Sequence, residues 1–371
     1  MSAKQKQFVY DSPEAQKLVE GLPHSAFVRQ GTMVAFPLAF PGATLPVVLD
    51  ESHITALDAT PEGIVYGGTG GKRAHIFVAM WHGVTGMVFD MKMVEGADAC
   101  SAVCCGNKQF LACVNGPRGG GRILMTRLEP PPYDLIQEWG FERPEFDDLG
   151  EPAPGETIVH AVADLSRERV VGVTSSHLFT VDFESKKIQV VAEIAGFGHL
   201  AVASSGSVVG RDGTSYLWRY DPHTQILHRE ASNLPDGAWS KAPLVWARDP
   251  RKGVLYTADD SGHLFSFDAE SGFSRSLGQT PLAPVGPLAV TFDGRVFGFC
   301  GEGIAKLFCY DPNRQEMTDL GAAVSVLERR RYGYTFGDAV IGRDGEIIFG
   351  EDDDFGHLWL YFPRISTART A

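Results

Sequence analysis

A pair of large apolar residues recurs seven times along this chain and constrains its fold more than any other feature. In the clearest copy, Gly253 to Asp268, an apolar run, a short Gly-containing loop and an alternating segment succeed one another as in a hairpin. Successive pairs lie 39 to 55 residues apart. A period of about 40 to 50 residues predicts a seven-bladed β-propeller of four-stranded blades. The pairs are Ile76-Phe77, Ile123-Leu124, Leu178-Phe179, Leu217-Trp218, Leu264-Phe265, Leu307-Phe308 and Leu358-Trp359.

The pattern inside each repeat favours strands over helices. Apolar and polar residues alternate with period two, and Gly, Asp, Pro and Ser bound each run. Asp-Pro turns at Asp221-Pro222 and Asp311-Pro312 close hairpins between the third and fourth strands. A chain of 371 residues could form two or three domains, but seven repeats use nearly all of it. We therefore predict an all-β, single-domain propeller.

The end of the last repeat predicts how the ring closes. After Leu358 to Phe362 comes Pro363, and too few residues follow to build a fourth strand. We expect the N-terminal segment 24–40, a strand pair turned at Gln30-Gly31, to supply it, because closure removes the two exposed sheet edges of an open ring. Residues 1–23 are predicted to be a helical extension, 24–365 the propeller and 366–371 a tail.

Charge and composition exclude several classes of function. A net charge of -13 disfavours binding to nucleic acid or to an anionic membrane. The first thirty residues lack a signal-peptide pattern and no long apolar run occurs, so a cytoplasmic protein is expected. The six cysteines are then expected to be reduced, buried thiols.

The loops that enter the first strand of each blade are expected to surround one mouth of the central channel, where propellers bind ligands. Small-apolar pairs, such as Ala56-Leu57 and Leu244-Val245, align the innermost strands at the channel axis. The loop 322–337 concentrates basic and aromatic residues, with Arg331 and Tyr332 among them, in an acidic protein. The mouth is therefore where we look for chemistry.

Three residues are candidate catalytic groups and five are candidate substrate-binding groups. Histidine and tyrosine can move protons, Arg and Lys can neutralise a carboxylate, and aromatic rings can cover a sugar. Trp239 could instead plug a blade interface, and the arginines of the loop could pair with acidic residues. The catalytic candidates are His160, His199 and Tyr334, and the binding candidates are His53, Trp239, Lys241, Arg331 and Tyr332.

A metal site is a further candidate in the last blades. The acidic loops near His263 and His357 carry carboxylates such as Asp354, which are ligands for Mn or Ca. The run of three aspartates lacks the spacing of a defined calcium loop, so a solvated turn is the competing interpretation. The residue before each repeated pair is often His, Arg or Lys, and such a ring could bind anions or serve blade packing.

The repeats GHLFSFD, YLWRYDP and KLFCYDP resemble a bacterial group of seven-bladed propellers that includes polysaccharide lyases and related sugar-active propellers. The resemblance covers residues 54–362 and rests on blade scaffolding, so no catalytic residue is carried over by matching. It implies a lyase or related enzyme that acts on an oligosaccharide containing a uronic acid. The alternatives are a non-catalytic scaffold that binds a protein or metabolite, and a metal-dependent lactonase-like hydrolase.

Overall fold

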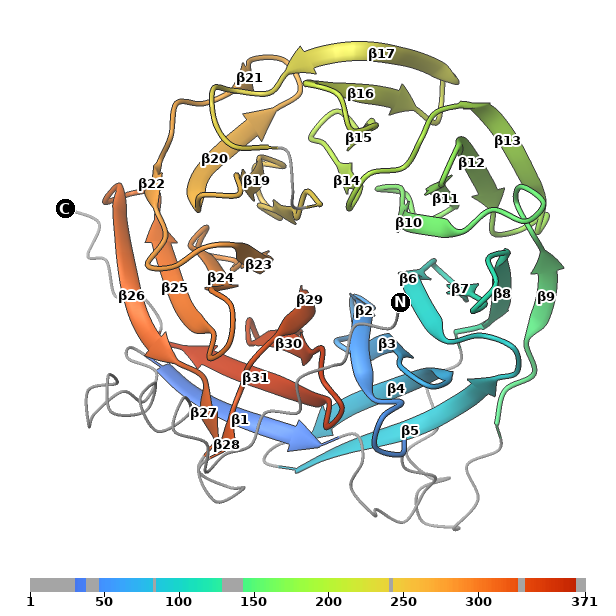
Figure 1. Cartoon of the computed structure of the whole chain (residues 1–371), viewed down its shortest axis with the longest axis horizontal. Helices are drawn as coiled ribbons and strands as arrows, with labels where there is room; N and C mark the ends of the chain where they lie inside the picture. The colour runs from blue at the N-terminus through green and yellow to red at the C-terminus, as the bar shows by residue number, and fades with distance from the viewer. Residues whose placement is uncertain are drawn as a thin grey trace.

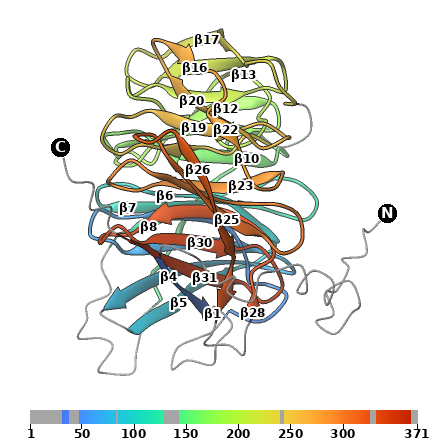
Figure 2. The ribbon, with the colours of Figure 1, turned by 90° about the vertical axis from the view of Figure 1, so that its left-hand side faces the viewer.

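The computed structural model describes residues 31–37, 47–82, 85–128, 143–239, 243–325 and 331–364, which form a ring of seven antiparallel sheets (Figure 1). The predicted all-β, seven-bladed propeller is confirmed. The predicted helical extension 1–23 and the tail 366–371 lie outside the described residues. The described part contains no helix long and apolar enough to cross a membrane. A view turned by 90° shows the same ring of sheets from its edge (Figure 2).

Each blade runs from an innermost strand at the ring axis to an outermost strand at the rim. Blades 1 to 3 are β2(His53–Ala59), β3(Val65–Gly70), β4(Ala74–His82), β5(Thr85–Val94); β6(Ala99–Cys105), β7(Gln109–Asn115), β8(Gly121–Arg127), β9(Asp147–Gly150); and β10(Ile158–Ala163), β11(Arg169–Thr174), β12(His177–Asp182), β13(Ile188–Glu193).

Blades 4 to 7 follow the same plan, with one extra strand in blade 5. They are β14(Ala201–Val202), β15(Val208–Arg211), β16(Tyr216–Asp221), β17(Ile226–Asn233); β18(Ala247–Arg248), β19(Leu255–Ala258), β20(His263–Asp268), β21(Gly272–Phe273), β22(Gly278–Gln279); β23(Val285–Val290), β24(Val296–Cys300), β25(Lys306–Asp311), β26(Glu316–Ala322); and β29(Phe336–Ile341), β30(Ile347–Glu351), β31(His357–Pro363) with β1(Gly31–Pro37).

The ring closes through β1, which is the outermost strand of blade 7. It pairs antiparallel with β31 over seven residues, from Gly31 opposite Pro363 to Pro37 opposite His357. Gly31 suits this contact because a Cβ there would lie 2.3 Å from a ring carbon of Tyr361. Closure by an N-terminal strand is therefore confirmed, and the other half of the predicted strand pair lies outside the described residues.

Five of the innermost strands carry a register shift near the end where they begin. In β10 and β29 the shift falls directly before His160 and Asp338. Comparable shifts occur in β2, β6 and β23. A β-bulge re-aims the side chains beside it and often occurs next to functional sites. The bulges therefore decide which polar side chains of the innermost strands reach the neighbouring blade.

Apolar side chains fill the space between adjacent blades. One cluster joins blades 4 and 5 and includes Leu217, Leu255 and Phe265. The sequence alignment is wrong in blade 5, because the predicted pair Leu244-Val245 precedes the innermost strand, which is β18. All six cysteines are free and buried, as predicted. Burial raises the pKa of the Cys100 thiol to about 12, so this thiol stays protonated at neutral pH.

Candidate functional site

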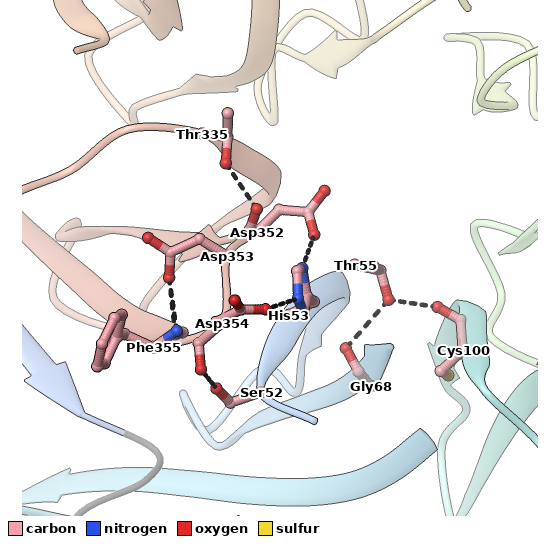
Figure 3. Close-up of polar contacts among 11 residues, drawn as sticks. Ser52, His53, Thr55, Gly68, Cys100, Thr335, Asp352, Asp353, Asp354 and Phe355 are labelled. Atoms are coloured by element: carbon pink, nitrogen blue, oxygen red, sulfur yellow. Dashed lines mark hydrogen bonds and ion pairs between the residues drawn. The ribbon is translucent and has the colours of Figure 1, made fainter. Parts of the chain in front are cut away.

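We call the mouth the end of the ring at which the seven innermost strands begin. His53 is the first residue of β2, and at the junction of blades 7 and 1 its ring lies between two aspartates (Figure 3). Its Nδ1 is 3.1 Å from Asp352 Oδ1 and its Nε2 is 2.8 Å from Asp354 Oδ1. The His53 side chain is 13% exposed, against 39% and 46% for the two aspartates. We call these three residues the clasp.

The backbone around the clasp explains why the two blades approach so closely. Ser52 donates its hydroxyl to the carbonyl oxygen of Asp354 at 3.0 Å, and Thr335 donates to that of Asp352 at 2.6 Å (Figure 3). A Cβ at Gly356 would lie 1.7 Å from the carbonyl oxygen of Ser52. Only glycine therefore allows the β30–β31 loop to lie on blade 1.

The clasp changes the chemistry expected of His53. The hydrogen bond to Asp352, together with Asp354, raises the pKa of His53 to about 9 despite burial. At neutral pH the ring is an imidazolium, and both N–H groups donate to carboxylates. His53 is therefore not poised to exchange protons near pH 7, in contrast to the expectation from its residue type. Asp354, which the sequence predicts to be a metal ligand, instead accepts a hydrogen bond from His53.

The two predicted catalytic histidines do meet. The rings of His160 and His199 stack with centroids 4.3 Å apart and planes 14° from parallel. They come from blades 3 and 4: His160 lies in β10, and His199 precedes β14. Both side chains are partly exposed. Because the stack joins two blades, it exists only when the ring has folded.

One hydrogen bond fixes the protonation state of His160. The backbone N–H of Leu200 donates to His160 Nδ1 at 3.2 Å. Nδ1 can accept only when it carries no proton, so a neutral ring has its proton on Nε2. His160 therefore presents an N–H donor through Nε2 and has no second nitrogen available to accept a proton. Of the two predicted base candidates, His199 is therefore the one whose ring nitrogens are open to accept a proton.

Both rings lose most of their hydration to the surrounding protein although each residue keeps some exposed surface, and this desolvation keeps them neutral. It lowers the pKa of His199 to about 4, and burial with the nearby His199 lowers the pKa of His160 well below its usual value. Among the described residues, neither ring nitrogen of His199 has a hydrogen-bond partner. At neutral pH the pair thus combines a fixed donor, His160, with a ring, His199, that is free to accept.

Asp338 and Asp58 are acids on the innermost strands that join neighbouring blades. Asp338 accepts from the N–H of Leu57 at 2.7 Å, and Asp58 accepts from that of Cys105 at 2.7 Å. Burial raises the pKa of Asp338 to about 7 and also raises that of Asp58. Arg167 lies near Asp58 and donates to the carbonyl of Cys105. These are structural contacts between blades.

The structure separates the predicted aromatic and cationic groups from the histidine pair. Trp239 is 8% exposed and packs on Phe265 with ring centroids 5.3 Å apart, while its Nε1 donates to the carbonyl of Pro235. It fills the interface of blades 4 and 5, the alternative role considered for it, and cannot present a ring face to a sugar. Lys241 lies outside the described residues.

Arg331 and Tyr332 form β28, which pairs with β27(Val324–Ser325). This hairpin lies beside β1 at the rim of blade 7, away from the innermost strands (Figures 1 and 2). Its backbone is therefore not part of the mouth, contrary to prediction. Tyr334 is half-buried in the segment that leads to β29. Blade 7 lies across the ring from blades 3 and 4, which hold the histidine pair.

The three predicted metal ligands have separate partners. His263 Nδ1 is 3.1 Å from Asp259 Oδ2, and His357 Nδ1 is 2.9 Å from Glu351 Oε2. Asp354 belongs to the clasp. No group of three or more His, Cys, Asp or Glu side chains within the described ranges is arranged to hold a metal ion. The metal prediction gains no support there.

The other basic residues that precede the repeated pairs also have acidic partners. Glu51 lies 2.9 Å from His75 and Glu156 lies 2.9 Å from His177. Lys306 lies 2.8 Å from Asp319. Because these partners belong to the same blades or to the loops that enter them, the ring of basic residues serves the internal structure of the blades.

Comparison with known proteins identifies the fold and not a family. No family model matches the chain, and no curated protein matches it. Among solved structures it is similar to virginiamycin B lyase from Staphylococcus aureus, with 9% identity, a TM-score of 0.65 and coverage of 90% of this chain and 99% of the lyase. A catalytically inactive histidine-to-alanine variant of that lyase with Quinupristin gives a TM-score of 0.62.

A second similar structure is the extracellular domain of a one-component system from B. thetaiotaomicron, with 14% identity and a TM-score of 0.56. The comparison covers 90% of this chain but only 40% of that domain. In all, 1328 solved chains match, so likeness alone does not select an activity. The class defined by fold and site is a seven-bladed propeller with a neutral histidine pair at its mouth.

Proposed function

We propose that the protein is a lyase that breaks a carbon–oxygen bond in an oligosaccharide containing a uronic acid, at the histidine pair of His160 and His199. The observation that carries this proposal is the different state of two stacked rings. One neutral imidazole has its Nδ1 occupied and offers Nε2–H, and the other has free ring nitrogens among the described residues. A β-elimination needs both functions, a base and a donor to a developing oxyanion.

In this proposal His199 removes the proton from the carbon next to the substrate carboxylate. The C–H electrons form the carbon–carbon double bond, the bond to the leaving oxygen breaks, and the proton ends on that oxygen. His160 donates through Nε2–H to the carboxylate oxygen on which charge develops. A neutral imidazole is a suitable donor here because it needs no proton from solution.

The two aspartates of the clasp favour one orientation of this substrate, with its carboxylate directed toward the histidine pair. The clasp carries two carboxylates and one imidazolium, so it is net negative. A uronic carboxylate is repelled by that side, and the neutral histidine pair across the ring offers an N–H donor instead. Sugar hydroxyls, which donate hydrogen bonds, suit the carboxylates. Lys241 remains a proposed carboxylate partner, and so does Arg331, although its β-hairpin lies at the rim.

The test is product formation from a panel of uronic-acid oligosaccharides, followed by the near-ultraviolet absorbance of the new double bond. His199→Ala should reduce the rate about 10²- to 10⁴-fold, the usual contribution of a general base. His228→Ala is the matched control, because His228 is exposed on the outermost strand of blade 4. No unsaturated product from any member of the panel, or full activity in His199→Ala, would overturn the proposal.

A further inference from the structure

Exposed apolar side chains gather where the loop that enters blade 1 meets the β30–β31 loop of blade 7. Ten large hydrophobic side chains are exposed in the described part of the chain, and three of them belong to these two loops. They are Val48 at 47%, Leu49 at 51% and Phe355 at 46% exposure. Single exposed hydrophobic residues are normal, but a group of them at one place marks an interaction surface. We call these three residues the apolar tip.

The conformation of the first loop holds two of these side chains in solvent. Val47 before them is fully buried and Glu51 after them is 1% exposed. The backbone N–H of Glu51 donates to the carbonyl oxygen of Val48 at 3.3 Å, which closes a turn with Leu49 and Asp50 at its tip. Asp50 has a φ of 61°, a left-handed conformation that Asp adopts more readily than most residues. Turn tips usually carry polar residues, so the exposed leucine has a cost that a partner would remove.

Hydrogen bonds between the two loops bring Leu49 and Phe355 close together. The backbone N–H of Asp50 donates to the carbonyl oxygen of Asp354 at 3.1 Å. Leu49 precedes Asp50 in the chain, and Phe355 follows Asp354. Their backbones therefore adjoin at this hydrogen bond. The Ser52 hydroxyl donates to the same carbonyl oxygen at 3.0 Å and holds the loops in this arrangement. The apolar tip is thus built by two blades and depends on the closed ring.

Phe355 lies on the side of the clasp that is turned away from the innermost strands. In Figure 3 it is on the far side of Asp354 from Thr55 and Cys100, which belong to β2 and β6 (Figure 3). A partner that binds the apolar tip therefore leaves the histidine pair, which lies across the ring, open to a small ligand. This inference goes beyond the proposed lyase activity and does not rest on it.

Carboxylates around the apolar tip decide which partner fits it. Asp50 is exposed, and the side chains of Asp352 and Asp354 are 39% and 46% exposed. Two cations lie nearby: His53 between the clasp aspartates, and Lys72, whose backbone N–H donates to the carbonyl oxygen of Asp50. The other charged residues of these loops are Asp353 and the ion pair of Glu51 with Arg73. Carboxylates therefore outnumber cations here, and the whole chain has a net charge of -13.

We propose that the apolar tip docks a basic segment of a partner protein, one that carries lysine or arginine beside leucine or an aromatic residue. The apolar side chains of that segment cover the tip, and its cations meet the carboxylates around it. An acidic segment is repelled. A second copy of this chain is a poor occupant, because a two-fold contact places the same aspartates against one another.

The experiment uses three synthetic peptides of equal length, built from lysine and leucine, from glutamate and leucine, and from lysine and serine. The lysine–leucine peptide should bind the full chain in a fluorescence anisotropy titration, and its affinity should fall as salt is added. The other two should bind much more weakly, because each lacks one of the two complementary features. Hydrogen exchange locates the site: the bound peptide should slow exchange of the amides of 48–53 and 352–357 and leave those of β17 unchanged.

Two substitutions separate the apolar and the acidic parts of the surface. Leu49→Ser removes a half-exposed apolar side chain and should weaken binding of the lysine–leucine peptide about 3- to 12-fold. Asp50→Asn removes one charge, keeps a residue type that tolerates a positive φ, and should weaken binding about 1.4- to 5-fold. Ile226→Ser is the matched control, because Ile226 is also 51% exposed but lies on the outermost strand of blade 4, and it should bind like the wild type.

Three results would overturn the docking surface. The lysine–leucine peptide could fail to bind the wild-type chain. It could bind Leu49→Ser and Ile226→Ser equally well, or slow exchange only outside the two loops, which would mean that it binds the acidic protein without using the tip. Alternatively, sedimentation velocity could show a dimer of the full chain that Leu49→Ser dissociates, which would assign the tip to a second copy. None of these results bears on the lyase assay, because that assay follows product formation at His199.

Discussion

His160 and Asp338 make the same hydrogen bond at equivalent positions in two blades. Each follows the bulge of its innermost strand, and in its ladder each aligns with the first residue of the repeated apolar pair, Leu178 or Leu358. Each also accepts from a backbone N–H of the next blade, at 3.2 Å for His160 and 2.7 Å for Asp338. The contact of His160 with blade 4 is therefore structural, and only its Nε2 side is free for chemistry.

Substitution of His160 should separate these two roles. His160→Asp should fold with near wild-type stability, because a carboxylate makes this contact at Asp338, but it has no N–H donor for a substrate. His160→Ala leaves the Leu200 N–H without an acceptor and should lose about 1 to 3 kcal/mol. Urea denaturation measures both values. Equal stability of the two variants would mean that the Leu200 hydrogen bond contributes nothing.

The clasp should make stability depend on pH in one direction. The folded-state pKa of His53 is about 9, above its ordinary value of 6.5. The stability that it contributes is therefore fully present below pH 6.5 and is lost as pH rises through 9. The difference in unfolding free energy between wild type and His53→Ala should shrink over that range. A difference that stays constant from pH 6 to 10 would contradict the clasp.

Ring closure by β1 predicts which N-terminal deletions the fold tolerates. Deletion of residues 1–40 removes β1 and exposes the edge of β31, so the product should be insoluble or much less stable. Deletion of residues 1–23 keeps β1 and should give a soluble, folded protein. Ala35→Asp places a charge at a position that is 3% exposed and should mimic the longer deletion. Equal melting temperatures for all four chains would refute closure by β1.

The fold can be predicted from the sequence because each strand and each turn is specified by residues that are close together in the chain. Each repeated pair, such as Leu264-Phe265, lies in the third strand of its blade, and the missing strand after Leu358 indicates where β1 must pair. The sequence pattern fails in blade 5 because its innermost strand, Ala247–Arg248, carries an arginine where the other blades have a second apolar residue. Without a clear apolar pair at Ala247-Arg248, the earlier pair Leu244-Val245 was the better match.

The candidate site was only partly predictable, because its contacts depend on partners far apart in the chain. His53 and Asp352 are separated by 299 positions, so residue type alone suggested a free histidine rather than the clasp. His160 and His199 were recognised as catalytic candidates, but the hydrogen bond from Leu200 that distinguishes them follows from a bulge.

The pH dependence of product formation by the wild-type protein tests the central claim most directly. The folded-state pKa of His199 is about 4, so this base is neutral at every pH above about 5. The rate of formation of the unsaturated product should rise with a midpoint near pH 4 and stay level from pH 6 to 8, while circular dichroism confirms that the chain remains folded. A midpoint near 6.5, the ordinary value for an exposed histidine, or the absence of any product, would contradict a partly buried, neutral histidine pair as the catalytic centre.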